Sequence, residues 1–440
     1  GEDSCNKNGH TCHAVTFTAW TDSTKLPETK GEYYLDTDVT LTETWTPASG
    51  TVLCLNGHNI TMNGSKKAAI YVINAFTLCD CKGGKDAYGQ ITHATGKTGS
   101  GVYVSGNGRF YMYGGSITLN TAAKGGGVKV TGGTVNMYGG EIANNKAAGH
   151  VKGTGNGGGV YVSGGTFNMR GGSITNNTTE VYGQGEGTGG VYVHANGTFN
   201  LYDGGEIKDN TATQYGGGVY VGSYGQSGTF HMYGGKITNN TGTQYGGGVY
   251  VYEGTFDMDD GEISGNKTNG PGGGVRVSRM NCVFTMRGGE IRDNTASSGG
   301  GVSVVDDGVF TMSGGSITKN KTTGTGGVSM NRGGKFTVSG TAVIKDNKKG
   351  SADNNVYLLN NKFITVSGHL DDGASIGVTT DKTPDAGGTI PIATATTGTG
   401  LTPADAAKFQ SDLGGYAVSV KSDGTGLVLV KAHTHYLCGE

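Results

Sequence analysis

The chain has 440 residues, of which 87 are Gly, 6 are Pro and 15% are charged, and its formal net charge is −2. Nucleic acid is excluded as an expected partner because phosphate binding needs clustered Lys and Arg, and a membrane span is excluded because no run of about 18 apolar residues occurs. Collagen and disorder are also excluded, since Gly follows no Gly-X-Y period and Val, Ile, Phe and Met recur at fixed places.

Three Cys and His residues near the N-terminus, in the sequence CNKNGHTCH, have the spacing of metal ligands: Cys5, His10 and Cys12. Thiolate sulfur and imidazole nitrogen are the ligands that Zn²⁺ prefers. We interpret residues 1–32 as an N-terminal Cys/His segment followed by a cap.

Three further Cys lie in the first coils of the domain that follows. Cys54 lies outward on its strand, beside the coil that carries Cys79 and Cys81. We expect either a local disulfide or inert packing where these segments lie side by side.

A repeated unit runs through residues 33–385. It reads GGGVYV, a turn, GTFxM, GG, x-I-x-x-N and a variable loop, with a period of 25 to 33 residues. Alternating apolar residues in Val-x-Val and Phe-x-Met, and the lone Ile, indicate three short strands with one buried face. Gly and Asn between them favour tight corners. The sequence therefore predicts an all-β fold, a right-handed single-stranded parallel β-helix, with three strands in each coil.

The Asn that closes each unit is expected to form a ladder in one corner of the β-helix. Its side chain can satisfy backbone groups of neighbouring coils that would otherwise be buried without partners. The predicted ladder comprises Asn120, Asn145, Asn177, Asn210, Asn240, Asn266, Asn294, Asn320 and Asn347, with Asn63 two coils upstream.

Two files of outward residues are the candidate binding surface. The residue between the two Val of the first strand reads Tyr103, Lys129, Tyr161, Tyr192, Tyr220, Tyr250, Arg276 and Ser303 in successive coils. The residue after the Met reads Tyr113, Tyr138, Arg170, Tyr202, Tyr233, Asp259 and Arg287. Exposed aromatic files suit carbohydrate binding. The alternative is that Tyr simply stabilises parallel strands by stacking on like neighbours.

The loops after the Asn are longest in the middle of the chain, and insertions on one side of a solenoid often mark its binding face. The alternative is drift in loop length without function. The residues expected to line this region are His150, Lys152, Glu180, Tyr182, Glu186, Tyr215 and Tyr245.

An acidic group lies in the sequence YEGTFDMDDGE, where Asp257 and Asp259 flank Met258. Paired carboxylates suit a glycosidase acid and base, or Ca²⁺ binding. The alternative is a charged ladder, in which Asp259 pairs with Arg287 of the next coil and Asp257 with His231 of the coil before.

Beyond the repeats, residues 386–431 are expected to form a C-terminal cap. The segment 402–412 predicts a short helix with Thr402 as its N-cap and Pro403 at its first position, followed by strands at 416–420 and 426–430. Residues 432–440 contain His433, His435 and Cys438. These residues predict an inter-unit linker that clips one unit of a tandem array to the next through Zn²⁺ or a disulfide. The alternative is an unstructured linker.

The GG-x-I and closing-Asn repeats resemble those of chlamydial polymorphic outer-membrane proteins. LCLNGHNI and the repeated YGGxI are similar to β-helix surface proteins of gut Firmicutes. These resemblances cover about residues 33–370. They imply a secreted or cell-surface protein, often adhesive, whereas the related pectate-lyase-like folds also include glycosidases and lyases.

The function expected from these features is an extracellular binding or adhesion module of a tandem-repeat bacterial surface protein. Its expected partners are a glycan or host surface polymer and the neighbouring unit of the same chain. The alternatives are a glycan-degrading enzyme that uses Asp257 and Asp259, and a purely structural stalk.

Overall fold

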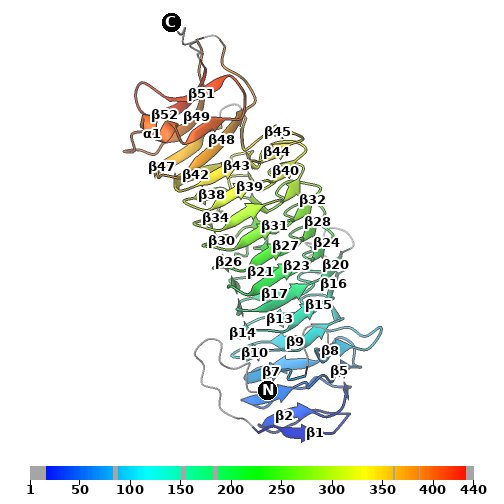
Figure 1. Ribbon diagram of the computed structural model, residues 1–440. Coiled ribbons are helices and arrows are strands. Elements are labelled where there is room, and N and C mark those ends of the chain that lie inside the picture. Colours follow the sequence, from blue (N-terminus) through cyan, green and yellow to red (C-terminus); the bar gives the residue numbers. More distant parts are fainter. Residues whose placement is uncertain are drawn as a thin grey trace.

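The computed structural model describes residues 16–82, 88–149, 155–181, 187–359, 362–385 and 387–432. They form a parallel β-solenoid of about 12 turns, with β1 at one end and β51 and β52 near the other (Figure 1). The predicted all-β, parallel β-helix fold is therefore confirmed. Three parallel ladders correspond to the three predicted strands of each coil, and a fourth set of short strands was not predicted.

The second strand of each coil belongs to a 17-stranded sheet. Its strands are β1 (Thr18–Trp20), β2 (Glu32–Leu35), β4 (Thr51–Cys54), β7 (Ala75–Cys79), β10 (Arg109–Met112), β14 (Thr134–Met137), β18 (Thr166–Met169), β22 (Thr198–Leu201), β26 (Thr229–Met232), β30 (Thr255–Met258), β34 (Val283–Met286), β38 (Val309–Met312), β42 (Lys335–Gly340), β47 (Ile364–Leu370), β49 (Ile390–Ala395), β51 (Tyr416–Val420) and β52 (Gly426–Lys431).

The first and third strands of the coils form two ladders of one 25-stranded sheet, joined where β46 pairs with β48. The first-strand ladder comprises β6 (Ile70–Val72), β9 (Val102–Val104), β13 (Val128–Val130), β17 (Val160–Ser163), β21 (Val191–His194), β25 (Val219–Val221), β29 (Val249–Tyr252), β33 (Val275–Ser278), β37 (Val302–Val305), β41 (Val328–Met330) and β46 (Val356–Leu358). The third-strand ladder comprises β3 (Val39–Leu41), β5 (Ile60–Met62), β8 (Gln90–His93), β11 (Ser116–Thr118), β15 (Glu141–Ala143), β19 (Gly172–Thr175), β23 (Gly205–Lys208), β27 (Lys236–Thr238), β31 (Glu262–Ser264), β35 (Glu290–Arg292), β39 (Ser316–Thr318), β43 (Val343–Lys345), β48 (Ser375–Thr380) and β50 (Phe409–Ser411).

A 10-stranded sheet is built from the segments that follow the corner Asn, which the sequence had suggested were only loops. Its strands are β12 (Thr121–Ala122), β16 (Lys146–Gly149), β20 (Thr178–Val181), β24 (Thr211–Ala212), β28 (Thr241–Gly242), β32 (Lys267–Thr268), β36 (Thr295–Ala296), β40 (Lys321–Thr322), β44 (Lys348–Lys349) and β45 (Ala352–Asp353). Tyr215 and Tyr245, which follow β24 and β28, pack against the outward tyrosines of the first-strand ladder.

The core is made of identical side chains placed one above another by the parallel register. Phe256, Phe284 and Phe310 are directly paired in neighbouring strands, and their ring centroids lie 4.6 and 4.8 Å apart with nearly parallel planes. These rings are fully buried, as are the Val, Met and Ile of the same coils. Burial of apolar area on this scale is the main stabilising contribution.

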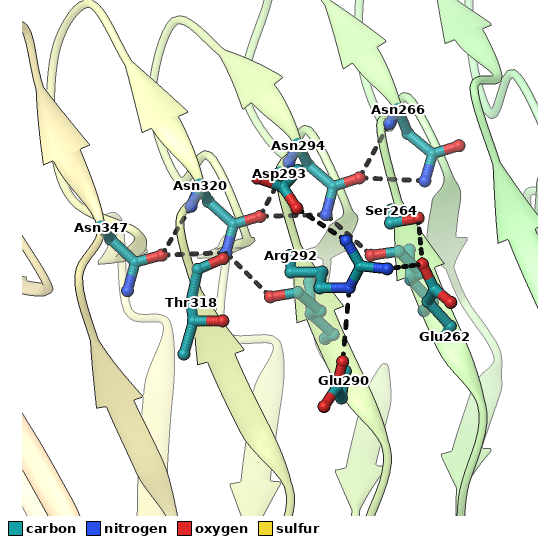
Figure 2. Close-up of polar contacts among 12 residues, drawn as sticks. Glu262, Ser264, Asn266, Glu290, Arg292, Asp293, Asn294, Thr318, Asn320 and Asn347 are labelled. Atoms are coloured by element: carbon teal, nitrogen blue, oxygen red, sulfur yellow. Dashed lines mark hydrogen bonds and ion pairs between the residues drawn. The ribbon is translucent and has the colours of Figure 1, made fainter.

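The predicted asparagine ladder is present and fully buried from Asn120 to Asn347 (Figure 2 shows its last four members). In each step, one Asn donates its backbone N–H and its side-chain N–H to the Oδ1 atom of the next. For Asn266 and Asn294 both distances are 2.9 Å. The residue before each ladder Asn takes a positive φ, for example 55° at Asp293. This left-handed corner is readily adopted by Asn, Asp and Gly.

The ends of the ladder differ from the prediction. Asn63 is exposed and has no place in it; instead the Nδ1 atom of His93 contacts Oδ1 of Asn120 at 2.6 Å. At the other end, Asn347 donates to Asn355, which in turn donates to the carboxylate of Asp412. The ladder therefore ends on a negatively charged acceptor in the C-terminal region.

The C-terminal region contains the predicted N-cap but a shorter helix than expected. Thr402 caps α1 (Pro403–Ala406), and Asp405 completes a capping box. The prediction that the helix extends to residue 412 is wrong, because Phe409 is buried and β50 pairs in parallel with β48. The two predicted strands are confirmed as β51 and β52, which pair antiparallel.

Candidate functional site

A row of exposed side chains runs along the C-terminal ends of successive strands of the 17-stranded sheet. We call Tyr113, Tyr138, Arg170, Tyr202 and Tyr233 the surface row. Each follows the inward Met or Leu that ends β10, β14, β18, β22 or β26, so all five residues leave the sheet on its outer side. Their backbone N–H groups donate to the Met or Leu carbonyl of the coil before at 2.7 to 2.9 Å, which holds the row in register.

Within the surface row the rings stack on one another. The ring centroids of Tyr113 and Tyr138 lie 4.8 Å apart with planes 6° from parallel, and those of Tyr202 and Tyr233 lie 4.9 Å apart at 15°. The guanidinium of Arg170, between the two pairs, lies 4.2 Å from the centroid of Tyr202. Because the stacked faces cover each other, these rings offer a ligand mainly their edges and hydroxyl groups.

The phenol groups of the surface row are available for binding. Tyr113, Tyr138 and Tyr233 are 54%, 39% and 43% exposed, and Tyr202 is half-buried. Among the residues that the structure describes, none forms a hydrogen bond with the hydroxyl of any of these four tyrosines. A phenol hydroxyl both donates and accepts, so the row presents repeated hydrogen-bonding groups at the spacing of the coils.

A polar ladder lies beside the surface row, in the outward position two residues earlier. Asn168 donates from Nδ2 to Oδ1 of Asn136 at 3.0 Å, and Asn200 donates to Asn168 at 2.8 Å. His231 and Asp257 continue this column, with Nδ1 and Oδ2 3.6 Å apart. These groups hold each other in place and form a polar column next to the rings.

The two candidate acidic residues lie at the end of this surface and are paired as the charged-ladder alternative predicted. Arg287 contacts both carboxylates, at 2.9 Å from Oδ1 of Asp259 and 3.3 Å from Oδ1 of Asp257. Both Asp side chains therefore interact with a cation of the next coil. This arrangement joins neighbouring coils; it gives no specific support to the glycosidase or Ca²⁺ alternatives.

The prediction that the first-strand file faces solvent is wrong, although its register is as predicted. Tyr161, Tyr192, Tyr220 and Tyr250 are paired strand to strand, but they are only 1 to 5% exposed. They point away from the main core and form a second, separate cluster. Alternation correctly gave their direction, but the segments after the corner Asn cover them.

Two residues that had been assigned to an exposed binding loop provide much of this cover. Tyr215 and Tyr245 stack on each other at 5.5 Å and 1°, and Tyr215 lies against Tyr250. Arg276 is buried with its guanidinium 4.1 Å from the Tyr245 ring. The sequence signal for this cover was TQYGGGVY, which occurs in two successive units and places a Tyr just before the glycine run.

A buried histidine completes the tyrosine cluster. The Nε2 atom of His194 lies 2.6 Å from the Tyr161 hydroxyl, and Nδ1 lies 2.8 Å from Oε1 of Gln226. Burial lowers the pKa of His194 to about 4, and the nearby Lys124 acts in the same direction. The neutral imidazole is therefore the form that the fold accommodates.

An open groove lies where the tyrosine cover is missing, on the N-terminal coils of the first-strand ladder. It has a volume of about 720 Å³, and its lining includes Tyr103, Lys66, Lys124 and Lys129. The ammonium of Lys129 lies 4.6 Å from the Tyr103 ring centroid. Within the described ranges, no carboxylate pairs with any of these three lysines.

The remaining predicted site residues divide into two groups. Glu180 forms an ion pair with Lys146 of the preceding coil. The others lie outside the described residues: His150, Lys152, Tyr182 and Glu186 of the loops, and Cys5, His10, Cys12, His433, His435 and Cys438 of the predicted zinc clip.

Comparison of the chain with protein-family models, with curated proteins and with solved structures finds no match. The resemblance to surface-protein and pectate-lyase-like families thus has no support from these comparisons. Among the residues that the structure describes, no helix has the length and apolar character needed to cross a membrane.

Proposed function

We propose that this chain is a binding module for an extended, hydroxyl-rich polymer such as a polysaccharide. The polymer lies along the β-helix axis, over the surface row and the adjacent polar ladder that contains Asn136, Asn168 and Asn200. The observation that carries this proposal is the set of four tyrosine hydroxyls without a hydrogen-bond partner among the described residues, three on exposed side chains and one on the half-buried Tyr202.

The repeat of the fold supports a polymer rather than a small ligand. Coils follow one another at about 4.8 Å, the spacing of strands in a sheet, so the same groups recur at that interval. A polymer of repeating units presents its hydroxyls periodically as well, and each unit can contact the same kind of site. Many weak contacts in a row then give affinity through multivalency.

The geometry also supports a specific mode of contact. Stacking between Tyr202 and Tyr233 leaves their ring edges and hydroxyls uncovered by each other, while Arg170 adds a cation with several N–H donors beside them. These rings are already fixed by their neighbours, so ordering them on binding costs little conformational entropy. In the wider proposal, this surface makes the chain an adhesive unit of a tandem-repeat protein at a bacterial cell surface.

The test measures binding of the full chain to immobilised cellulose, xylan, mannan and polygalacturonate. Tyr202→Phe with Tyr233→Phe removes two hydroxyls but keeps the stacked rings. We expect this double variant to lose about 10-fold in affinity for the polymer that the wild type binds, on the scale of two hydrogen bonds. Tyr202→Ala with Tyr233→Ala should lose more, since it also removes the ring edges.

Tyr224→Phe is the matched control. Tyr224 is 57% exposed and lies before β26, whereas Tyr233 follows it. The control should bind like the wild type. Binding that is unchanged in both double variants, or absent from every polymer, would contradict the proposal. Reducing ends released by the wild type, but not by Asp257→Asn or Asp259→Asn, would instead favour the glycan-degrading enzyme.

A second candidate function rests on the lysine groove. Its three ammonium groups lack carboxylate partners among the described residues and suit an anionic ligand such as a uronate chain. Lys124→Ala with Lys129→Ala should weaken binding of polygalacturonate and reduce its dependence on salt. An unchanged salt dependence would exclude this groove as the site.

A further inference from the structure

Three cysteine thiols meet on two neighbouring coils near the N-terminal end of the β-helix. Cys54 ends β4 and is paired in register with Cys79, which ends β7, and Cys81 follows two residues later. Their three sulfur atoms all lie within 4.8 Å of one another, and those of Cys54 and Cys81 are 2.7 Å apart. All three are free thiols in the structure.

The backbone around Cys54 favours a thiolate. The N–H of Cys81 donates to the Cys54 sulfur at 3.1 Å, and the N–H of Asn56 also donates to it. Backbone N–H donors of this kind stabilise the sulfur as the negatively charged ligand that a metal ion requires.

Asp80, between the two cysteines of the second coil, fixes the loop rather than adding a ligand. Its Oδ1 atom accepts from the backbone N–H of Gly57 at 3.0 Å and of Lys82 at 3.2 Å, and its Oδ2 atom accepts from Gly89 at 2.6 Å. The carboxylate therefore ties the Cys-Asp-Cys segment to two other parts of the chain. This holds Cys79 and Cys81 in place beside Cys54.

We propose that Cys54, Cys79 and Cys81 form a site for a thiophilic metal ion, with Zn²⁺ as the reference ion, bound by three thiolates. Zn–S bonds of about 2.3 Å place the sulfurs around one ion roughly 3.8 Å apart, which the observed cluster accommodates with small shifts. Binding forms three S–Zn bonds and releases the three thiol protons to solvent, without oxidation or reduction. Cys81 is exposed, so solvent reaches the cluster from that side.

Only the metal uses all three sulfurs. A disulfide joins two of them and leaves the third unexplained, whereas soft ions prefer several thiolates at once. The site would also join two coils close to the end of the solenoid, where an exposed terminal coil needs stabilisation. It uses none of the residues of the predicted zinc clip; Cys5, Cys12 and Cys438 lie outside the described residues.

The experiment uses the full chain with Cys5, Cys12 and Cys438 replaced by Ser, reduced, freed of metal and kept anaerobic. Zn²⁺ is titrated against a chromophoric chelator, and Co²⁺ is added separately for its thiolate charge-transfer absorption. We expect one ion per chain. Cys81→Ser should weaken Zn²⁺ binding by about 100-fold or more and remove most of the Co²⁺ absorption.

Cys282→Ser is the matched control, because Cys282 is a buried thiol on a distant coil whose sulfur contacts the backbone N–H of Glu253 and the carbonyl of Ser278. It should leave stoichiometry and affinity unchanged. Circular dichroism verifies that each variant is folded. If Cys81→Ser does not fold, Cys79→Ser takes its place in the titration. Folded protein that binds no Zn²⁺, unchanged affinity in Cys81→Ser, or a disulfide within the cluster of the anaerobically isolated chain would overturn the proposal.

Discussion

Asn294 donates its backbone N–H and its side-chain N–H to the same oxygen, Oδ1 of Asn320, both at 3.0 Å (Figure 2). The Nδ2 group also donates to the carbonyl of Ile263 at 2.9 Å. One buried amide thus joins its own coil to the coil before it and the coil after it. This bonding is repeated along the corner, so the ladder fixes the register of every coil it crosses.

Asn294→Ala should destabilise the protein strongly. It leaves the backbone N–H of Asn266 and one N–H of its side chain without partners in a fully buried corner, and it removes the bond from Nδ2 to the carbonyl of Ile263. Each unsatisfied group costs on the order of 1 kcal/mol or more, so we expect a loss of about 3 kcal/mol in the free energy of unfolding. Urea unfolding followed by circular dichroism measures it. Asn331→Ala, at an exposed Asn, is the control and should change stability by less than about 0.5 kcal/mol.

Tyr220→Ala should reveal the second cluster as a structural core. Tyr220 is 1% exposed and packs against Tyr192 and Tyr250. Removing a buried aromatic ring leaves a cavity, and we expect a loss of about 3 kcal/mol. Tyr113→Ala, which removes an exposed ring of the surface row, should cost less than about 1 kcal/mol. Equal losses of unfolding free energy in Tyr220→Ala and Tyr113→Ala would contradict the assignment of the first-strand tyrosines to a buried core and of the surface row to the solvent.

Acid should destabilise the fold through His194. Its pKa is about 4 in the folded state, below the ordinary value of 6.5, so the unfolded chain takes up a proton first as the pH falls. The contribution of His194 to the free energy of unfolding is therefore fully present above pH 6.5 and declines as the pH falls from 6.5 to 4. Below pH 4 the protein has lost up to about 3 kcal/mol of stability through this residue. Unfolding of the wild type and of His194→Gln at pH 7 and pH 5 measures this effect.

His194→Gln should have a shallower decline between pH 7 and pH 5 than the wild type. His58→Gln, at a partly exposed histidine, should decline like the wild type. A wild-type curve that is flat between these values, or parallel to that of His194→Gln, would mean that the buried imidazole does not control acid stability.

Gly248→Ala should disturb one corner of the β-helix. A methyl group there would lie 2.6 Å from the carbonyl oxygen of Gly274 and 3.1 Å from Nδ2 of the ladder residue Asn266. The backbone of the next coil cannot move away without breaking its hydrogen bonds to neighbouring coils. We therefore expect a loss of about 2 kcal/mol in the free energy of unfolding. Gly400→Ala, where the methyl would meet nothing within 4 Å, should be neutral in the same unfolding measurement.

The parts of the fold that repeat could be predicted from the sequence, because a period is visible in one chain. The spacing of Asn120 to Asn347 gave the ladder, and Phe-x-Met gave the inner face of the second strand. Asn355 could not be found in this way. It follows Asn347 by 8 residues, through the antiparallel pair β44 and β45 instead of a complete coil.

The candidate site was predictable only in part, for a physical reason. Alternation along a strand fixes the direction of a side chain, so it placed both Tyr192 and Tyr202 on the outside of the β-helix. Exposure depends also on what covers that outside. Tyr215 and Tyr245 cover the first file, whereas the second file, with Tyr113 and Tyr233, remains open to solvent.

The most direct test of the polymer-binding account is the dependence of affinity on oligosaccharide length, measured by calorimetry with the polymer that the binding panel identifies. The surface row spans five successive coils, from Tyr113 to Tyr233. Affinity should therefore rise with each added sugar up to about that length and then level off. In the double variant Tyr202→Phe with Tyr233→Phe, affinity should stop increasing at a shorter oligosaccharide. Affinity that is independent of length in the wild type would contradict binding along the axis.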